Sequence, residues 1–95
     1  MGTRLRKYIW VNRSYFNTGL KPLDILILSM IEEHNTHGRS FELTNEELAD
    51  MFGETVYAVK RSLSRLEERG MIERESSYVS GNGKRNRRRE IRMRE

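Results

Sequence analysis

The sequence contains no cysteine, a single proline and no long apolar run. The absence of cysteine excludes disulfides, thiolate zinc sites and cysteine nucleophiles. The longest aliphatic run, residues 25–28, is too short to cross a bilayer, and residues 1–10 are mostly basic and polar, unlike an apolar signal segment. At 95 residues the chain is long enough for one compact domain. We therefore expect a soluble, cytoplasmic protein with no membrane partner.

Positive charge is concentrated at the two ends of the chain. Residues 1–13 carry four basic side chains and no acid, and residues 84–95 carry seven basic side chains and two acids. Residues 14–83 contain seven basic and twelve acidic side chains, so the middle of the chain is acidic although the formal net charge is +4. A uniformly solvated surface does not need this segregation, whereas a protein that binds a polyanion with its ends does.

The chain divides by composition into a basic and aromatic segment, 1–19, and a predicted folded domain, 20–95. Within the first segment, residues 7–11 fit a strand packed on the domain and equally an arm that becomes ordered on a partner. Tyr8 and Trp10 are predicted to pack against the protein rather than to stack on bases.

The first helix is predicted to begin at Pro22, a favoured first-turn residue, and to end between Asn35 and Gly38. Apolar residues occupy almost the whole circumference of this helix, because Ile25 and Leu28 lie outside its main apolar stripe. Either the aromatic N-terminal segment or a second subunit must cover these two residues. We expect a homodimer formed at least partly through this helix and the N-terminal segment.

Two further helices are marked by their capping residues. Thr44 and Glu47 have the spacing of a capping box, which predicts a short helix that ends near Gly53. Thr55 is a favoured N-cap residue, and a third helix is predicted over residues 55–69 before Gly70.

The C-terminal part is predicted to be a hairpin. Residues 71–75 and 90–94 are the strand candidates, the second with alternating side chains, and the Asn-Gly pair at residues 82–83 is a strong turn signal. A third short strand is possible at residues 40–43. Some of the arginines among Arg85, Arg87, Arg88 and Arg89 are expected to pair with Glu73 and Glu75 across the hairpin.

This order of elements resembles the winged helix-turn-helix plan. Residues 43–53, LTNEELADMFG, are similar to the first helix and turn of bacterial winged-helix regulators, and residues 59–72, VKRSLSRLEERGMI, to their recognition helix as it enters the wing. The N-terminal domains of plasmid and phage replication initiators have a similar layout. Glu54 departs from the pattern, which has an apolar residue after the turn glycine, and Val56 is the substitute. The resemblance implies a mainly α fold with three helices and a wing of two or three strands.

The resemblance also implies that the protein binds double-stranded DNA and is not an enzyme. The exposed side of the third helix would enter the major groove, where basic side chains donate to guanine. Its candidate contacts are Thr55, Tyr57, Lys60, Arg61, Ser64 and Arg65. The wing would hold phosphates or a narrow minor groove through Lys84, Arg85, Arg87, Arg88 and Arg89. A basic N-terminal arm would add Arg4, Arg6 and Lys7.

The leading biological role is transcriptional regulation. The alternatives are an origin-binding replication or transfer protein of a plasmid or phage and, from a different class, a protein-interaction module. No cofactor, metal or small-molecule ligand is predicted. His34 and His37 lack the further ligands that a metal site needs, and helix capping accounts for His34. No serine has the base and acid neighbours of a nucleophile.

Overall fold

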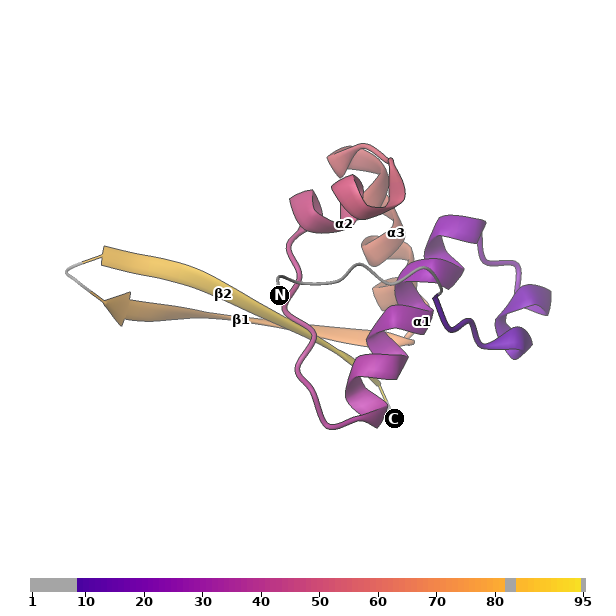
Figure 1. Ribbon diagram of the computed structural model, residues 1–95, viewed down its shortest axis with the longest axis horizontal. Helices are drawn as coiled ribbons and strands as arrows, with labels where there is room; N and C mark the ends of the chain where they lie inside the picture. Colours follow the sequence, from indigo (N-terminus) through magenta and orange to yellow (C-terminus); the bar gives the residue numbers. More distant parts are fainter. Residues whose placement is uncertain (1–8, 82–83, 95) are drawn as a thin grey trace, which may run out of the picture.

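The chain folds into a helical body from which one long hairpin projects (Figure 1). The computed structural model describes residues 9–81 and 84–94, except for the side chains of residues 79–87. After a short 3-10 helix, η1, three α-helices are followed by two strands. The bounds are η1 Arg13–Asn17, α1 Pro22–Thr36, α2 Asn45–Phe52, α3 Val56–Glu68, β1 Ile72–Gly81 and β2 Lys84–Met93.

The core lies where the three helices meet the base of the hairpin. It is formed by the apolar faces of α1, α2 and α3 together with one residue from each strand and one from the loop before α2. Its buried members are Ile27, Leu28, Ile31, Phe41, Leu48, Ala49, Val59, Leu63, Leu66, Ile72 and Ile91. The apolar core thus holds the hairpin at its base, because Ile72 and Ile91 are its buried residues in the described part of the chain.

The predicted helix ends are confirmed. The Thr44 hydroxyl accepts from the Glu47 amide at 3.1 Å while the Glu47 carboxylate accepts from the Thr44 amide at 2.8 Å, and this reciprocal pair starts α2. The Thr55 hydroxyl accepts from the amide of Ala58 at 3.0 Å and starts α3. Gly53, with φ of 65°, closes α2 in the left-handed region, where a side chain would be strained.

The hairpin is twice as long as the sequence pattern predicts. Its strands have ten residues each and pair without a bulge, from Ile72 opposite Met93 to Gly81 opposite Lys84. The outer half was missed because it covers no core, so its sequence shows no apolar alternation. The proposed turn residues Asn82 and Gly83 lie outside the described residues. Of the possible third strand, one bridge remains, between Phe41 and Ile91.

The N-terminal segment lies along α1, where the sequence left the choice between this segment and a second subunit open. Ile25 and Leu28 are 4% and 0% exposed in the single chain. The Asn12 amide donates to the Ser29 hydroxyl at 3.3 Å, and the Tyr15 hydroxyl donates to Glu32 at 2.8 Å, so residues 12–15 lie along α1. The burial of these two residues therefore requires no second subunit, and the homodimer stays a prediction without this argument.

The aromatic residue that packs in this segment is Tyr15. Tyr15 rests against the core, whereas Trp10 and Phe16 are 51% and 63% exposed. The packing expected of Trp10 was therefore wrong, and Tyr8 lies outside the described residues. Burial and the hydrogen bond to Glu32 raise the pKa of Tyr15 to about 12.

Three helices followed by an antiparallel hairpin form the mainly α, winged helix-turn-helix architecture that the sequence predicts. Among the described residues, no helix combines the length and the apolar character needed to span a membrane.

Candidate nucleic-acid interface

Apart from Arg65, which bonds to Asp24 in α1, the side chains of α3 have three main directions. One face, with Val59, Leu63 and Leu66, is buried in the core. A second, with Lys60 and Ser64, faces a cleft beside the hairpin. A third, which we call the ridge, consists of Tyr57 and Arg61 and is exposed. The four-residue spacing of Tyr57 and Arg61 places them one above the other on the same line of the helix.

The two ridge residues contact each other. The Arg61 Nη1 donates to the Tyr57 hydroxyl at 3.0 Å, and its Cζ lies 5.7 Å from the centre of the Tyr57 ring. Tyr57 is 66% exposed, and Val56 beside it is 36% exposed. The N-terminal half of α3 therefore presents an arginine, a phenol and an apolar side chain to solvent.

The cleft lies between α3, the hairpin and the N-terminal end of α2. It has a volume of about 680 Å³ and is lined by polar and charged side chains. The described lining residues are Glu42, Thr44, Asn45, Glu46, Lys60, Ser64, Glu67, Arg74, Ser76, Arg88 and Arg89. Sequence reasoning missed Glu42, Asn45 and Arg74 because their neighbours in the cleft are brought together only by the fold.

The arginines of the cleft are engaged within the protein, two of them by glutamates. Arg88 forms two hydrogen bonds to the Glu42 carboxylate, at 3.0 and 2.6 Å, and these lower the pKa of Glu42. Arg89 donates to the Asn45 side chain and to the Leu43 carbonyl, each at 2.7 Å. Arg74 is paired with Glu67. No partner is recorded for the ammonium group of Lys60 among the residues that the structure describes.

The cross-strand pairing is made by a different arginine from those in the predicted wing set. Arg92 contacts Glu73 at 3.4 Å and Glu75 at 3.0 Å. Arg88 reaches the loop before α2 instead, because strand pairing sets it opposite Ser77 rather than a glutamate. The side chains of Lys84, Arg85 and Arg87 lie outside the described part of the chain, and their backbone belongs to β2.

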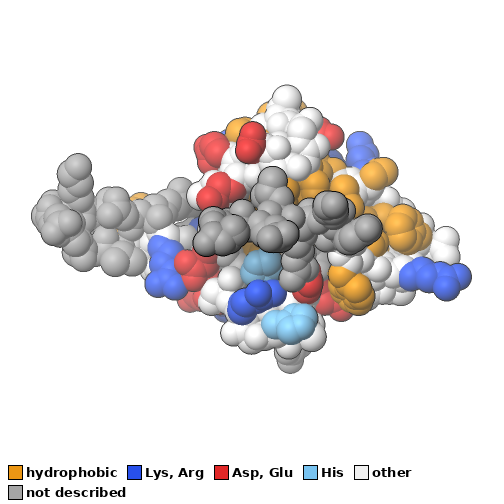
Figure 2. Space-filling model, viewed as in Figure 1, with side chains coloured by type: hydrophobic (Ala, Val, Ile, Leu, Met, Phe, Trp, Pro, Cys, Tyr) orange, Lys and Arg blue, Asp and Glu red, His pale blue; other side chains and the backbone are white. Residues whose placement is uncertain are grey.

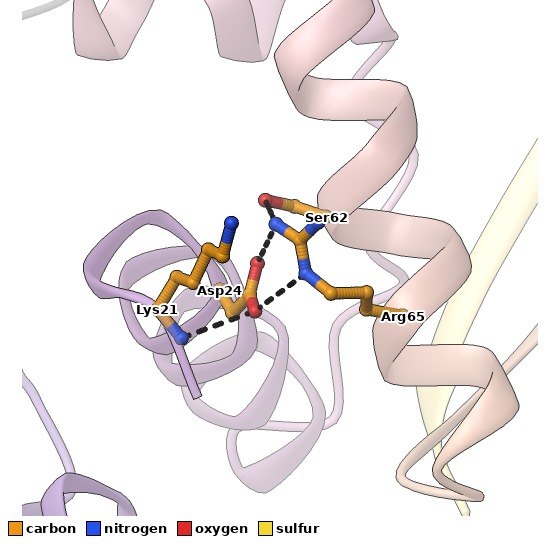
Figure 3. Close-up of polar contacts among 4 residues, drawn as sticks. All are labelled: Lys21, Asp24, Ser62 and Arg65. Atoms are coloured by element: carbon orange, nitrogen blue, oxygen red, sulfur yellow. Dashed lines mark hydrogen bonds and ion pairs between the residues drawn. The ribbon is translucent and has the colours of Figure 1, made fainter. Parts of the chain in front are cut away.

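Arg65, predicted as a DNA contact, is engaged inside the domain. Its Nε and Nη2 donate to the two carboxylate oxygens of Asp24 in α1, at 3.0 and 2.9 Å (Figure 3). Asp24 is 1% exposed and also accepts from the Lys21 amide at 3.2 Å, at the start of α1. Burial opposes the charge on Asp24, but the hydrogen bonds from Arg65, Ser62 and Lys21 outweigh it and lower the pKa of Asp24. The pair therefore joins α1 to α3.

The remaining predicted contacts are distributed unevenly. Thr55 is exposed, and its hydroxyl is used to cap α3. Arg4, Arg6 and Lys7 lie outside the described residues.

In the view of Figure 2 acidic side chains gather over α2, whose exposed residues include Glu46, Glu47 and Asp50. A polyanion would be repelled by this face of α2 and would instead approach the ridge and the hairpin.

The rings of the two histidines contact carbonyls of α1. The Nδ1 of His34 lies 3.0 Å from the Met30 carbonyl, and that of His37 lies 2.9 Å from the Glu33 carbonyl, near the end of α1. Within residues 9–81 and 84–94 no group of three or more potential ligands could hold a metal ion.

The comparisons with known proteins point to one family. Residues 25–80, more than half of the chain, match the Crp-like helix-turn-helix domain. No solved structure matches the chain. The matched region runs from α1 to the outer part of β1 and includes the turn between α2 and α3. The chain therefore belongs to the Crp-like helix-turn-helix domains, a family of winged DNA-binding domains.

Proposed function

We propose that this protein binds double-stranded DNA in a sequence-specific manner through the ridge of α3. The observation that carries the proposal is the exposed Tyr57–Arg61 pair in the N-terminal half of a helix whose opposite face is buried. The N-terminal part of the second helix of a helix-turn-helix unit is the part that enters the major groove. Arginine there has the donors that match the O6 and N7 atoms of guanine.

The cleft and the wing would hold the sugar–phosphate backbone beside that groove. Lys60 and Ser64 face the cleft from α3, and Arg88 faces it from β2. We propose that Lys84, Arg85, Arg87 and Arg89 contribute further phosphate or minor-groove contacts, and that Arg4, Arg6 and Lys7 extend them. Thr55, at the N-terminal end of α3, would add a contact to the backbone. Arg65 is left out of this set, since Asp24 occupies its guanidinium.

The role that this binding best supports is transcriptional regulation in the cytoplasm, without catalysis. Membership of a family of DNA-binding domains supports it. The division into a segment, 1–19, and a domain, 20–95, stays a prediction. So does the homodimer, which now lacks the support of an open α1 face.

Selection of bound duplexes from a random pool, followed by anisotropy titration of the winner, tests the proposal. We expect a consensus, and an affinity for it well above that for a scrambled duplex of the same length. A palindromic consensus would indicate two copies, to be checked by light scattering. If the selection enriches no sequence, sequence-specific binding is refuted. An affinity for an acidic protein surface equal to that for the selected duplex would favour a protein-interaction module.

A further inference from the structure

We infer that Tyr57 is a positioning residue: it holds the Arg61 guanidinium in the orientation from which Arg61 contacts a guanine, and makes no base contact of its own. The inference rests on the proposed function and gives the two ridge residues, Tyr57 and Arg61, different roles. It changes the role of Tyr57 from an independent DNA contact, as the sequence suggests, to a support for its neighbour.

The contact between the two residues uses both parts of the tyrosine. The hydroxyl accepts a hydrogen bond from Arg61 Nη1 at 3.0 Å. The ring lies 5.7 Å from Cζ, within the range in which a guanidinium is attracted by an aromatic ring. The hydrogen bond and the ring contact together restrict the rotation of the Arg61 side chain. It therefore loses less conformational entropy on binding DNA than an unrestrained surface arginine would.

The donors that Arg61 keeps are suited to a guanine. A guanidinium carries five N–H groups in one plane, and Tyr57 takes one of them. Two parallel N–H groups along another edge remain available for the O6 and N7 atoms. Among the described residues, Tyr57 is the one partner recorded for the Arg61 side chain.

Lys60, one residue before Arg61 in the chain, differs in both surroundings and chemistry. It faces the cleft beside the hairpin, and neither Tyr57 nor Arg61 is among the described residues that line that cleft. An ammonium group on a flexible stem acts as a point charge, which suits a phosphate better than a particular base edge. The hydrogen-bond donors of Arg61 on the ridge therefore have a defined direction, whereas those of the Lys60 ammonium group do not.

A double-mutant cycle of Tyr57→Phe and Arg61→Ala tests the inference. Tyr57→Phe keeps the ring and removes only the hydroxyl, and both positions are exposed, so the fold is retained. Affinity is measured for the selected duplex and for duplexes with each base pair changed in turn. Tyr15→Phe serves as the matched control, because its hydroxyl binds Glu32 on α1 instead of contacting α3.

We expect Arg61→Ala to reduce discrimination at one guanine about tenfold or more. Tyr57→Phe should reduce discrimination at the same guanine by roughly twofold to tenfold, the usual effect of one hydrogen bond. In the Arg61→Ala background it should have no further effect. Tyr15→Phe should leave every base preference unchanged.

Three results would overturn the inference. Tyr57→Phe could keep full discrimination, it could add its whole effect to that of Arg61→Ala, or it could alter preference at a different base pair. In each of these cases the wild-type protein still prefers its selected duplex, so the proposed function stands. A wild-type protein that prefers no duplex would overturn the function itself and the inference with it.

Discussion

Removing Arg65 should cost this protein more stability than removing an equally exposed arginine elsewhere. Arg65→Met keeps most of the side-chain stem and deletes the guanidinium, which leaves the Asp24 carboxylate, 1% exposed, without its cation. Loss of one partner of a buried ion pair costs about 3–5 kcal/mol. We expect a value of about 3 kcal/mol, at the lower end of that range, because Asp24 keeps the hydrogen bond from the Lys21 amide.

The opposite change should cost less. Asp24→Asn removes the buried charge and leaves Arg65, whose side chain is 29% exposed, partly in contact with water. We expect a loss of about 1–2 kcal/mol, and a double variant that is more stable than the sum of the two losses predicts. Arg74→Met is the matched control: Arg74 is also 29% exposed, but its partner Glu67 is 42% exposed. Loss of that surface pair should cost less than about 1 kcal/mol.

Urea unfolding followed by circular dichroism measures these free energies, and its pH dependence supplies a second test. Because the pKa of Asp24 is lowered in the folded protein, the contribution of the pair is complete above the ordinary carboxyl pKa and is lost as the pH falls through the lower folded value. In Arg65→Met the buried carboxylate has no cation and its pKa should be raised, so acid relieves the penalty. The deficit of this variant should therefore shrink on acidification.

The reasoning is refuted if Arg65→Met is no less stable than Arg74→Met, or if the cycle with Asp24→Asn is additive. DNA binding gives an independent check at a temperature where all variants are folded. If Arg65 contacts DNA, Arg65→Met should lose more affinity than Asp24→Asn, whereas an internal role predicts comparable losses.

Three further predictions concern the wing, α1 and the turn before β1. Affinity for DNA should fall steeply as salt rises, and a flat plot of log affinity against log salt would contradict this. Glu42→Gln, which releases Arg88, should strengthen binding to specific and scrambled duplexes alike and steepen the salt dependence. Arg88→Ala should weaken binding to both duplexes and make the salt dependence shallower. Leu28→Glu should unfold the monomer rather than dissociate a dimer, as circular dichroism and light scattering together would show, because Leu28 is fully buried in one chain. Gly70→Ala should lower stability by about 1 kcal/mol in urea unfolding, since φ is 72° there, and an unchanged midpoint would be evidence against a left-handed residue.

The order and ends of the helices were predictable because they depend on contacts between residues close in sequence. Thr44 and Glu47 are three positions apart and cap α2 within one turn, and Thr55 caps α3 in the same way. Gly53 is required by its own backbone angle. The buried residues of α3, Val59, Ser62, Leu63 and Leu66, recur at helical spacing.

The partners of Arg65 and Arg88 were not predictable, because each of these pairs joins residues far apart in the chain. Arg65 meets Asp24 across 41 positions, and Arg88 meets Glu42 across 46. An arginine on a helix surface has the same local sequence whether it faces a carboxylate or a DNA phosphate. Only the packing of α1 on α3 shows that Arg65 is occupied.

The sequence by itself determined where the helices begin and end, and which half of the chain carries the basic hairpin, since caps, glycines and charge are local properties. The tertiary structure alone decided what covers α1, how far the hairpin extends and which arginines are left for DNA. Ile25 and Leu28 are buried within one chain, and Asn12 and Tyr15 bond to Ser29 and Glu32 of α1 across 17 positions, a long-range contact that no periodicity encodes. The outer hairpin is held by backbone pairing, which leaves no mark in the side-chain pattern.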